Sequence, residues 1–344
     1  MSESEPPAPI PLAKPISGVE IVCVALLPIL CGYLILTILT SMNFFPWFYG
    51  EAPGKPLSRM ELRQSLWVGA IAAPFYFLLA LLLLRLGIGM PIPGTGLTTR
   101  NLGRNILGGL LFAVIFVPGT YGILTLALMV LEAVGSKPKD HPFTQLGSSG
   151  LSPIEWALLI FGAVVVAPVW EEFVYRGLIQ PWVMRRGRTG GLIVLAITAA
   201  LALYSITEAW SPSPSIRELV IVLAPVWILL PLVGVYHFLD RRNTEWGGLF
   251  ATALLFAWVH VNVWPSPVPL LWLALGLGWL AWRGRSLAGA IVLHAVFNAI
   301  ACAALLYGGK DSDVEKTPIP PAHIVPDRKD LTPPALSPSR RGSG

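Results

Sequence analysis

Three groups of polar side chains interrupt the apolar segments of this chain, and their residue types are those of acid–base chemistry. The first group, Glu171, Glu172 and Arg176, directly follows the apolar stretch 156–170. A charged residue near the middle of a membrane helix costs about 2.5 to 3.5 kcal/mol on insertion scales. Membrane helices keep such residues where the charges pair, line a wet cavity or take part in a reaction. Function is therefore expected in this region.

The spacing within the first group assigns different roles to its two glutamates. Glu172 and Arg176 are four residues apart, so they share a helix face and can form an ion pair that holds the carboxylate in place. Glu171 is rotated by about 100° from Glu172 and can point into a cavity instead. There it can accept a proton as a general base, while Glu172 stays ionised as a support. The alternative is a structural ion pair that only locks this helix to a neighbour.

The second and third groups supply histidines and an amide. His260 lies near the end of the apolar segment 249–261, where a lone histidine is also typical of a hydrogen-bonded core residue. His294 and Asn298 are four residues apart in the last apolar segment, and two polar groups on one face indicate a lined site. The sequence has no His-Glu-x-x-His pair that would present two metal ligands on one helix. We therefore expect no metal and no other cofactor.

Composition predicts that these groups lie in a multi-pass membrane protein. Of 344 residues, 54% are hydrophobic and only 12% are charged, and the mean hydropathy is +0.67. Soluble domains carry about 25% charged residues, and the apolar runs lack the alternation of a membrane barrel. We predict an all-α, polytopic bundle of about eight to nine transmembrane helices around an intramembrane polar cavity. The apolar segments are 19–39, 66–84, 106–131, 153–170, 191–206, 219–238, 249–261, 268–282 and 287–306.

The distribution of the apolar segments divides the chain into a membrane domain, residues 18–307, and two tails. Residues 1–17 and 308–344 are Pro-rich, the latter also Ser-rich, and both are predicted to be disordered. Basic residues are more numerous in the loops on the N-terminal side, which favours a cytoplasmic N-terminus in a plasma membrane, or in the inner membrane of a bacterium. The net charge of +5 resides largely in such loops. We therefore expect the lipid bilayer and a membrane-associated peptide or protein substrate as partners, and no nucleic acid.

The three polar groups share a one-turn spacing, with the patterns Glu171-Glu172-x-x-x-Arg176, Phe256-x-x-x-His260 and His294-x-x-x-Asn298. In this order they resemble the motifs of the intramembrane glutamic endopeptidases, the CAAX-protease and bacteriocin-processing family, which includes the Ras-converting prenyl-protein protease. The resemblance covers about residues 150–305. It implies a bundle of about eight membrane helices around a cavity open to the cytosol. It also implies hydrolysis of peptide bonds in membrane-associated substrates, and it leaves open whether these are prenylated.

The resemblance also implies a role for each polar residue. Glu171 is similar to the base that activates water for attack on the peptide carbonyl, and His260 would help to position or activate that water. His294 and Asn298 would stabilise the oxyanion that develops. The supporting residues would be Glu172 and Arg176.

One departure from the family pattern is the long segment between Arg176 and His260, which we interpret as a helical insertion at about residues 190–245. Three other functions stay open on the residues alone. The chain could be a non-enzymatic membrane scaffold or immunity-type protein that keeps the motif as a polar lock. It could be a zinc metalloprotease that uses Glu171, His260 and His294 as ligands, or a proton-coupled transporter with a Glu/His relay.

Overall fold

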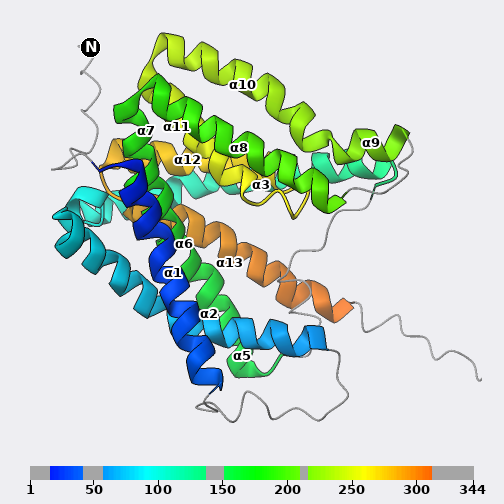
Figure 1. Ribbon diagram of the computed structural model, residues 1–344. Helices are drawn as coiled ribbons and strands as arrows, with labels where there is room; N and C mark the ends of the chain where they lie inside the picture. The colour runs from blue at the N-terminus through cyan, green and yellow to red at the C-terminus, as the bar shows by residue number, and fades with distance from the viewer. Residues whose placement is uncertain (1–15, 42–56, 137–150, 210–215, 312–344) are drawn as a thin grey trace, which may run out of the picture.

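The computed structural model describes residues 16–41, 57–136, 151–209 and 216–311, which form a bundle of helices with no strand among them (Figure 1). The predicted all-α class is confirmed. In chain order the elements are α1 (Gly18–Ser41), α2 (Leu57–Leu82), η2 (Leu83–Ile88), η3 (Ile92–Thr95), α3 (Leu102–Ala133), α5 (Pro153–Phe161), η4 (Gly162–Val166), α6 (Ala167–Glu172), η5 (Phe173–Ile179), α7 (Gln180–Arg186), α8 (Arg188–Ala209), α9 (Ile216–Val222), α10 (Ala224–Arg242), α11 (Thr244–Trp258), α12 (Pro267–Gly284) and α13 (Ala288–Asp311). The predicted tails lie outside the described residues, except for residues 16–17 and for residues 308–311, which continue α13.

Four helices of the described chain are long and apolar enough to cross a membrane: Leu102–Ala133, Pro153–Arg186, Arg188–Thr207 and Ala288–Leu306. On α3 only a narrow stripe is buried, and its first five residues are spaced by three or four, whereas most other side chains of the helix are partly or fully exposed. Val114, for example, is 71% exposed. Apolar side chains exposed at this density suit a lipid environment, so the chain is a membrane protein. The total of eight to nine spans stays a prediction. The buried stripe of α3 comprises Asn105, Gly109, Ala113, Val117, Thr120 and Leu131.

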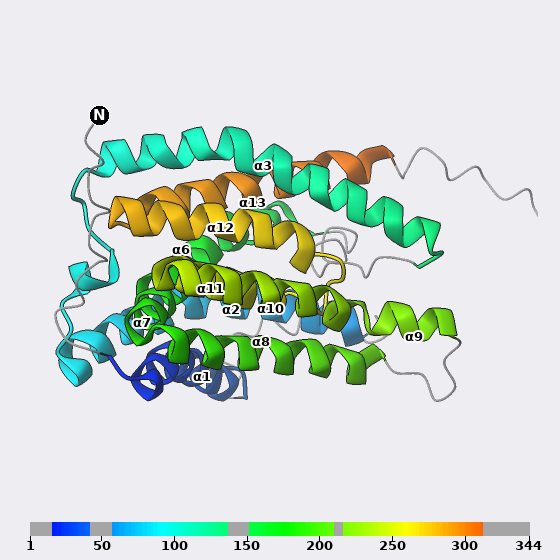
Figure 2. The ribbon, with the colours of Figure 1, turned by 90° about the horizontal axis from the view of Figure 1, so that it is seen from above.

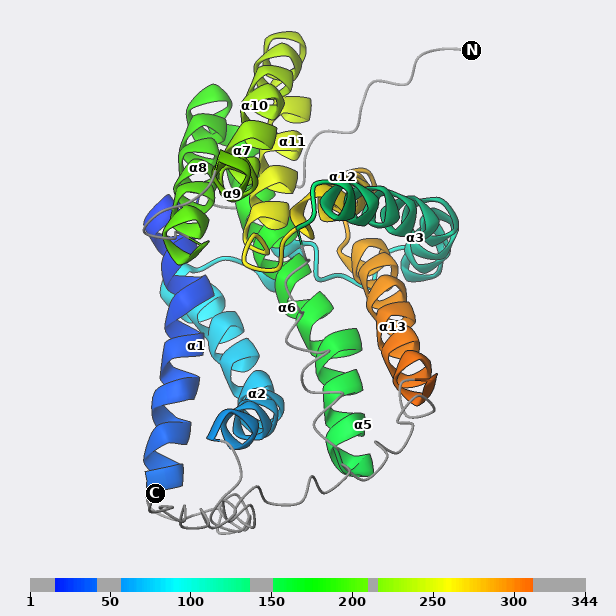
Figure 3. The same cartoon turned by 90° about the vertical axis from the view of Figure 1, so that its right-hand side faces the viewer.

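One unbroken helix, Pro153–Arg186, runs through the bundle, with α1 and α2 on one side and α3 and α13 on the other (Figure 3). It begins at Pro153, as the predicted segment does, and Ser152 and Glu155 form a reciprocal capping box at this end. The predicted end at residue 170 is wrong. The helix continues through the charged motif because those charges are paired inside the bundle, and two π-helical stretches, η4 and η5, adjust its register.

The segment 190–245 forms a helical pair, α8 and α10, which packs beside α11 (Figure 2). The predicted single segment 219–238 is interrupted at Leu223, where α9 ends and α10 begins. Pro225 explains the break, since it has no backbone N–H to donate to the preceding turn. That this pair is an insertion stays a prediction.

Glycines set how closely α3 and α13 approach each other. A Cβ added at Gly109 would overlap the carbonyl oxygen of Gly289. A Cβ added at Gly289 would lie 2.9 Å from the carbonyl oxygen of Asn105. Small residues at such crossings let helices pack backbone to backbone, which is a principal source of helix association in membranes. This contact holds the helix that carries His294.

We predict that Gly109→Ala destabilises the protein by about 1 to 3 kcal/mol, because the new methyl group forces the α3–α13 backbones apart. The matched control is Gly122→Ala on the same helix, where nothing lies within 4 Å of the added Cβ. That change should be neutral or slightly stabilising, since alanine favours a helix more than glycine does. Thermal unfolding in detergent measures both. Equal melting temperatures for the two variants would contradict the close approach.

Candidate active site

The buried centre of the site is an ion pair on the long central helix. Nη1 of Arg176 donates to Oε1 of Glu172 at 3.1 Å, and both side chains are almost fully shielded from solvent. The guanidinium also stacks over the ring of Phe256 at 4.2 Å. The predicted pairing of these two residues is therefore present. Because a buried charge is costly unless it is paired and hydrogen-bonded, each member of the pair requires the other.

His294 extends this pair into a chain of polar contacts. Its Nδ1 lies 2.9 Å from the same Oε1 of Glu172, and its Nε2 lies 3.9 Å from Oε2 of Glu171. A carboxylate that already accepts from Arg176 can only accept again, so Nδ1 of His294 carries the proton of this bond. Nε2 is thereby turned toward Glu171. The order of groups is Arg176, Glu172, His294 and Glu171.

The two adjacent glutamates have different surroundings, as their spacing predicts. The side chain of Glu172 is 0% exposed and that of Glu171 is 26% exposed. Among the described residues, Oε2 of Glu172 has no hydrogen-bond partner, which leaves one buried acceptor of this carboxylate unused. Glu171 is therefore partly accessible, whereas Glu172 is enclosed and its other oxygen accepts from two donors.

Gln180 is a polar residue of this region that the sequence interpretation missed. It lies one turn beyond Arg176 and is buried, and its Nε2 donates to the backbone oxygen of Gly278 at 3.0 Å. Arg176 makes the equivalent contact to the oxygen of Ala274 at 3.4 Å. The two donors are four residues apart and so are their acceptors on α12. The spacing from Glu172 through Arg176 to Gln180 was the signal that could have identified it.

His260 lies beside this cluster but makes no direct hydrogen bond to it within the described residues. The sequence predicted it inside an apolar segment, and this is wrong. Asn243 caps α11 at its N-terminus, so this helix begins at Thr244. It ends at Trp258, two residues before His260. Nδ1 of His260 lies 2.9 Å from the carbonyl oxygen of Phe256, so this nitrogen carries a proton and Nε2 is free to accept.

The ring of Phe256 connects the two histidines. Its centroid lies 5.3 Å from the ring of His260 and 5.7 Å from the ring of His294. Tyr175 packs edge-on against the same ring at 5.2 Å. Both histidines of the predicted site therefore contact one aromatic side chain, His294 from α13 and His260 from the turn that follows α11.

Asn298 makes a backbone contact that follows from a proline. In η4 the N–H of Ala167 bonds to the oxygen of Gly162, five residues back. The next bond in this register would need an N–H from Pro168, which has none. The oxygen of Ala163 is therefore available, and Nδ2 of Asn298 donates to it at 2.7 Å. The second N–H of this amide has no partner within the described chain.

The structure thus brings four of the six predicted residues into one hydrogen-bonded or near-contact chain and places the other two beside it. The four are Arg176, Glu172, His294 and Glu171. Among the described residues, no group of three His, Cys, Asp or Glu side chains is arranged to hold one metal ion. The arrangement offers a partly exposed carboxylate, Glu171, beside an imidazole nitrogen of His294, and the buried carboxylate of Glu172 holds that imidazole.

Comparison with known proteins identifies the segment that carries this cluster. Residues 153–237 and 229–300 match the family model described as type II CAAX prenyl endopeptidase Rce1-like. No curated protein and no solved structure matches the chain. The matched ranges contain all three polar motifs, which confirms the resemblance drawn from them. Residues 153–300 are therefore similar to the type II CAAX prenyl endopeptidases that this Rce1-like family model describes.

Proposed function

We propose that this protein is an intramembrane endopeptidase in which Glu171 activates the water that cleaves a peptide bond. The observation that carries the proposal is the 3.9 Å separation between Oε2 of Glu171 and Nε2 of His294. That separation is too long for a direct hydrogen bond, and a water molecule beside the two atoms can contact both. The difference in exposure between Glu171 and Glu172 supports the choice of Glu171 as the base.

In the proposed reaction, the water oxygen attacks the carbonyl carbon of the substrate while one water proton passes to Glu171. The carbonyl oxygen becomes an oxyanion. The tetrahedral intermediate then collapses, the carbon–nitrogen bond breaks, and Glu171 returns its proton to the leaving nitrogen. The products are a carboxylic acid and an amine, so one water is consumed and the base is regenerated.

The oxyanion needs preorganised donors, and two side chains are available for this role. Nε2 of His294 donates when the imidazole is protonated, and the second N–H of Asn298 is unused by the backbone contact to Ala163. Nε2 of His260 accepts, because its Nδ1 donates to the Phe256 carbonyl. We assign His260 to orienting the water. Glu172 and Arg176 are positioning residues that hold His294.

The family points to a CAAX-type substrate, a peptide whose C-terminal region is attached to the membrane through a lipid. We propose that such a peptide enters from the basic end of the bundle and that this end is cytoplasmic. Several helices end there with arginines in their last turns, and positive residues favour the cytoplasmic side. These residues are Arg185, Arg186, Arg241, Arg242 and Arg283. The N-terminal end of α1 lies at the same end, because Gly18 is next to Trp182.

We predict that Glu171→Gln lowers kcat by about 10²- to 10⁴-fold, the usual contribution of a general base, and leaves the melting temperature unchanged. Cleavage of a farnesylated CAAX peptide by the purified protein in liposomes measures the rate. Glu132→Gln, an exposed carboxylate outside the site, is the matched control and should retain full activity.

The same assay separates the other candidate functions. Wild-type activity that survives in Glu171→Gln would rule out the glutamate as the base. Loss of wild-type activity in a chelator, restored by zinc, would instead favour a metalloprotease. Wild-type protein that cleaves no membrane peptide but moves protons across the liposome would favour the transporter.

A second prediction concerns the supporting pair. Arg176→Met should destabilise the fold by about 3 to 5 kcal/mol, because it leaves Glu172 charged and buried without its cation. The double variant Glu172→Gln/Arg176→Met removes both charges and should recover most of that loss. Thermal unfolding in detergent gives the coupling between the two sites. If the double variant loses as much unfolding free energy as Glu172→Gln and Arg176→Met lose together, the two residues are not coupled and Arg176 does not compensate the charge of Glu172.

A further inference from the structure

A hollow lies between the N-terminal end of α8 and the C-terminal half of α10. It is an open cavity of about 470 Å³ and shares no lining residue with the Glu171–His294 cluster. Its volume falls in the range of about 300 to 1,000 Å³ that is usual for small-molecule sites. The lining residues are Arg188, Gly234, His237, Phe238, Arg241 and Arg242.

The positive charge of this cavity is not balanced by neighbouring acids. Within the described residues, none of Arg188, Arg241 and Arg242 forms an ion pair with a carboxylate. The nearby Asp240 is buried on another face of α10, against Gly247 of α11, where an added Cβ would lie 2.9 Å from the Cβ of Asp240. Asp240 acts electrostatically on the hydroxyl of Tyr236 next to Arg188, but no carboxylate of the described residues lines the cavity itself.

The walls of the cavity are held together by a direct contact. The hydroxyl of Tyr236 donates to the backbone oxygen of Arg188 at 3.4 Å, which ties the first turn of α8 to α10. The start of α8 also directs backbone N–H groups outward, and these favour an anion. Guanidinium groups bind phosphate oxygens through paired hydrogen bonds. The chemistry that fits is a phosphate group.

An apolar surface continues from the same cavity along α10. Phe238 lines the cavity and is 55% exposed, and the guanidinium of Arg242 stacks on its ring at 4.5 Å. Farther along the helix, Val235, Leu230 and Trp227 are also exposed. A free phosphate would make no use of this surface, whereas the acyl chains of a lipid would cover it.

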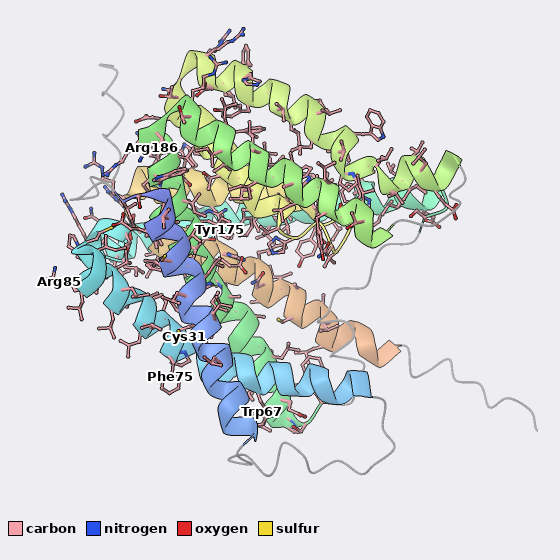
Figure 4. The ribbon with its side chains drawn as sticks, viewed as in Figure 1. Cys31, Trp67, Phe75, Arg85, Tyr175 and Arg186 are labelled. Atoms are coloured by element: carbon pink, nitrogen blue, oxygen red, sulfur yellow. The ribbon has the colours of Figure 1, made fainter. Side chains whose placement is uncertain are left out.

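The position of the cavity agrees with a lipid head group. It opens at the basic end of the bundle, where Figure 4 shows Arg186 and Arg85 at the same side of the molecule. Basic residues near a membrane surface attract anionic lipids of the cytoplasmic leaflet. We propose that this cavity binds the phosphate of an anionic phospholipid and so fixes the α8–α10 pair at the membrane surface.

The test is lipid binding by the purified full-length protein, measured by native mass spectrometry with phosphatidylglycerol and with phosphatidylcholine. Wild-type protein should retain phosphatidylglycerol selectively. The variant Arg188→Gln/Arg241→Gln/Arg242→Gln should lose this lipid by at least about tenfold, since each arginine near an anionic surface contributes about a factor of five. The three side chains are exposed, so the variant should keep its melting temperature.

Two controls separate a site from general surface charge. Arg85→Gln/Arg100→Gln/Arg104→Gln removes the same charge from exposed positions outside the cavity and should retain the lipid. Gly234 lines the cavity, so Gly234→Phe fills it without changing the charge. The new side chain can be accommodated because nothing lies within 4 Å of the added Cβ. This variant should lose the lipid. Gly122→Phe, at an equally open position on α3, should not lose it.

Three results would overturn the proposal. Equal loss of phosphatidylglycerol in both triple-arginine variants would mean that only net charge matters. Full binding by Gly234→Phe would mean that the lipid lies elsewhere. Displacement of the lipid from wild-type protein by millimolar inorganic phosphate would assign the cavity to a soluble phosphate instead of a lipid.

Discussion

The site depends on the compensation of charge that is buried in an apolar bundle. Glu172 and Arg176 are both shielded from solvent, and neither would be stable there alone. Oε1 of Glu172, which accepts from Arg176, can accept a second hydrogen bond, and His294 donates it. The orientation of the imidazole, and therefore the nitrogen that faces Glu171, follows from this one requirement. A buried pair that contributes little net stability can still determine the geometry of a reacting group.

The row of polar side chains at the site also depends on a neighbouring helix, α12, whose backbone oxygens accept hydrogen bonds from it. Arg176 and Gln180 donate to the oxygens of Ala274 and Gly278 on α12. A Cβ at Gly278 would lie 3.0 Å from Oε1 of Gln180, so a larger side chain there would push this amide away. Small residues thus do two things in this fold. They allow helices to pack closely, and they expose carbonyl oxygens to the polar side chains of the site.

The sequence predicts which residues share a helix face better than it predicts the depth at which side chains of different helices meet. The spacing of Glu172 and Arg176 fixes a common face, and the ion pair follows. The spacing cannot tell at which depth His294 meets them, because depth depends on where each helix begins and how it is packed. The predicted end of the central helix at residue 170 is wrong for a related reason, because charged residues do not end a helix where they are paired inside the bundle. The π-helical stretches carry no propensity signal, so the partner of Asn298 could not be foreseen.

That partner explains how α13 is held in register with the central helix. Pro168 removes one donor, the oxygen of Ala163 becomes available, and Asn298 bonds to it. One turn earlier on α13, His294 bonds to Glu172. The pairs 298 with 163 and 294 with 172 run in opposite directions along the two helices, so the helices are antiparallel and joined at two levels. A single bond would allow α13 to rotate about its axis, whereas two bonds on one face do not. Nε2 of His294 therefore keeps its position opposite Glu171.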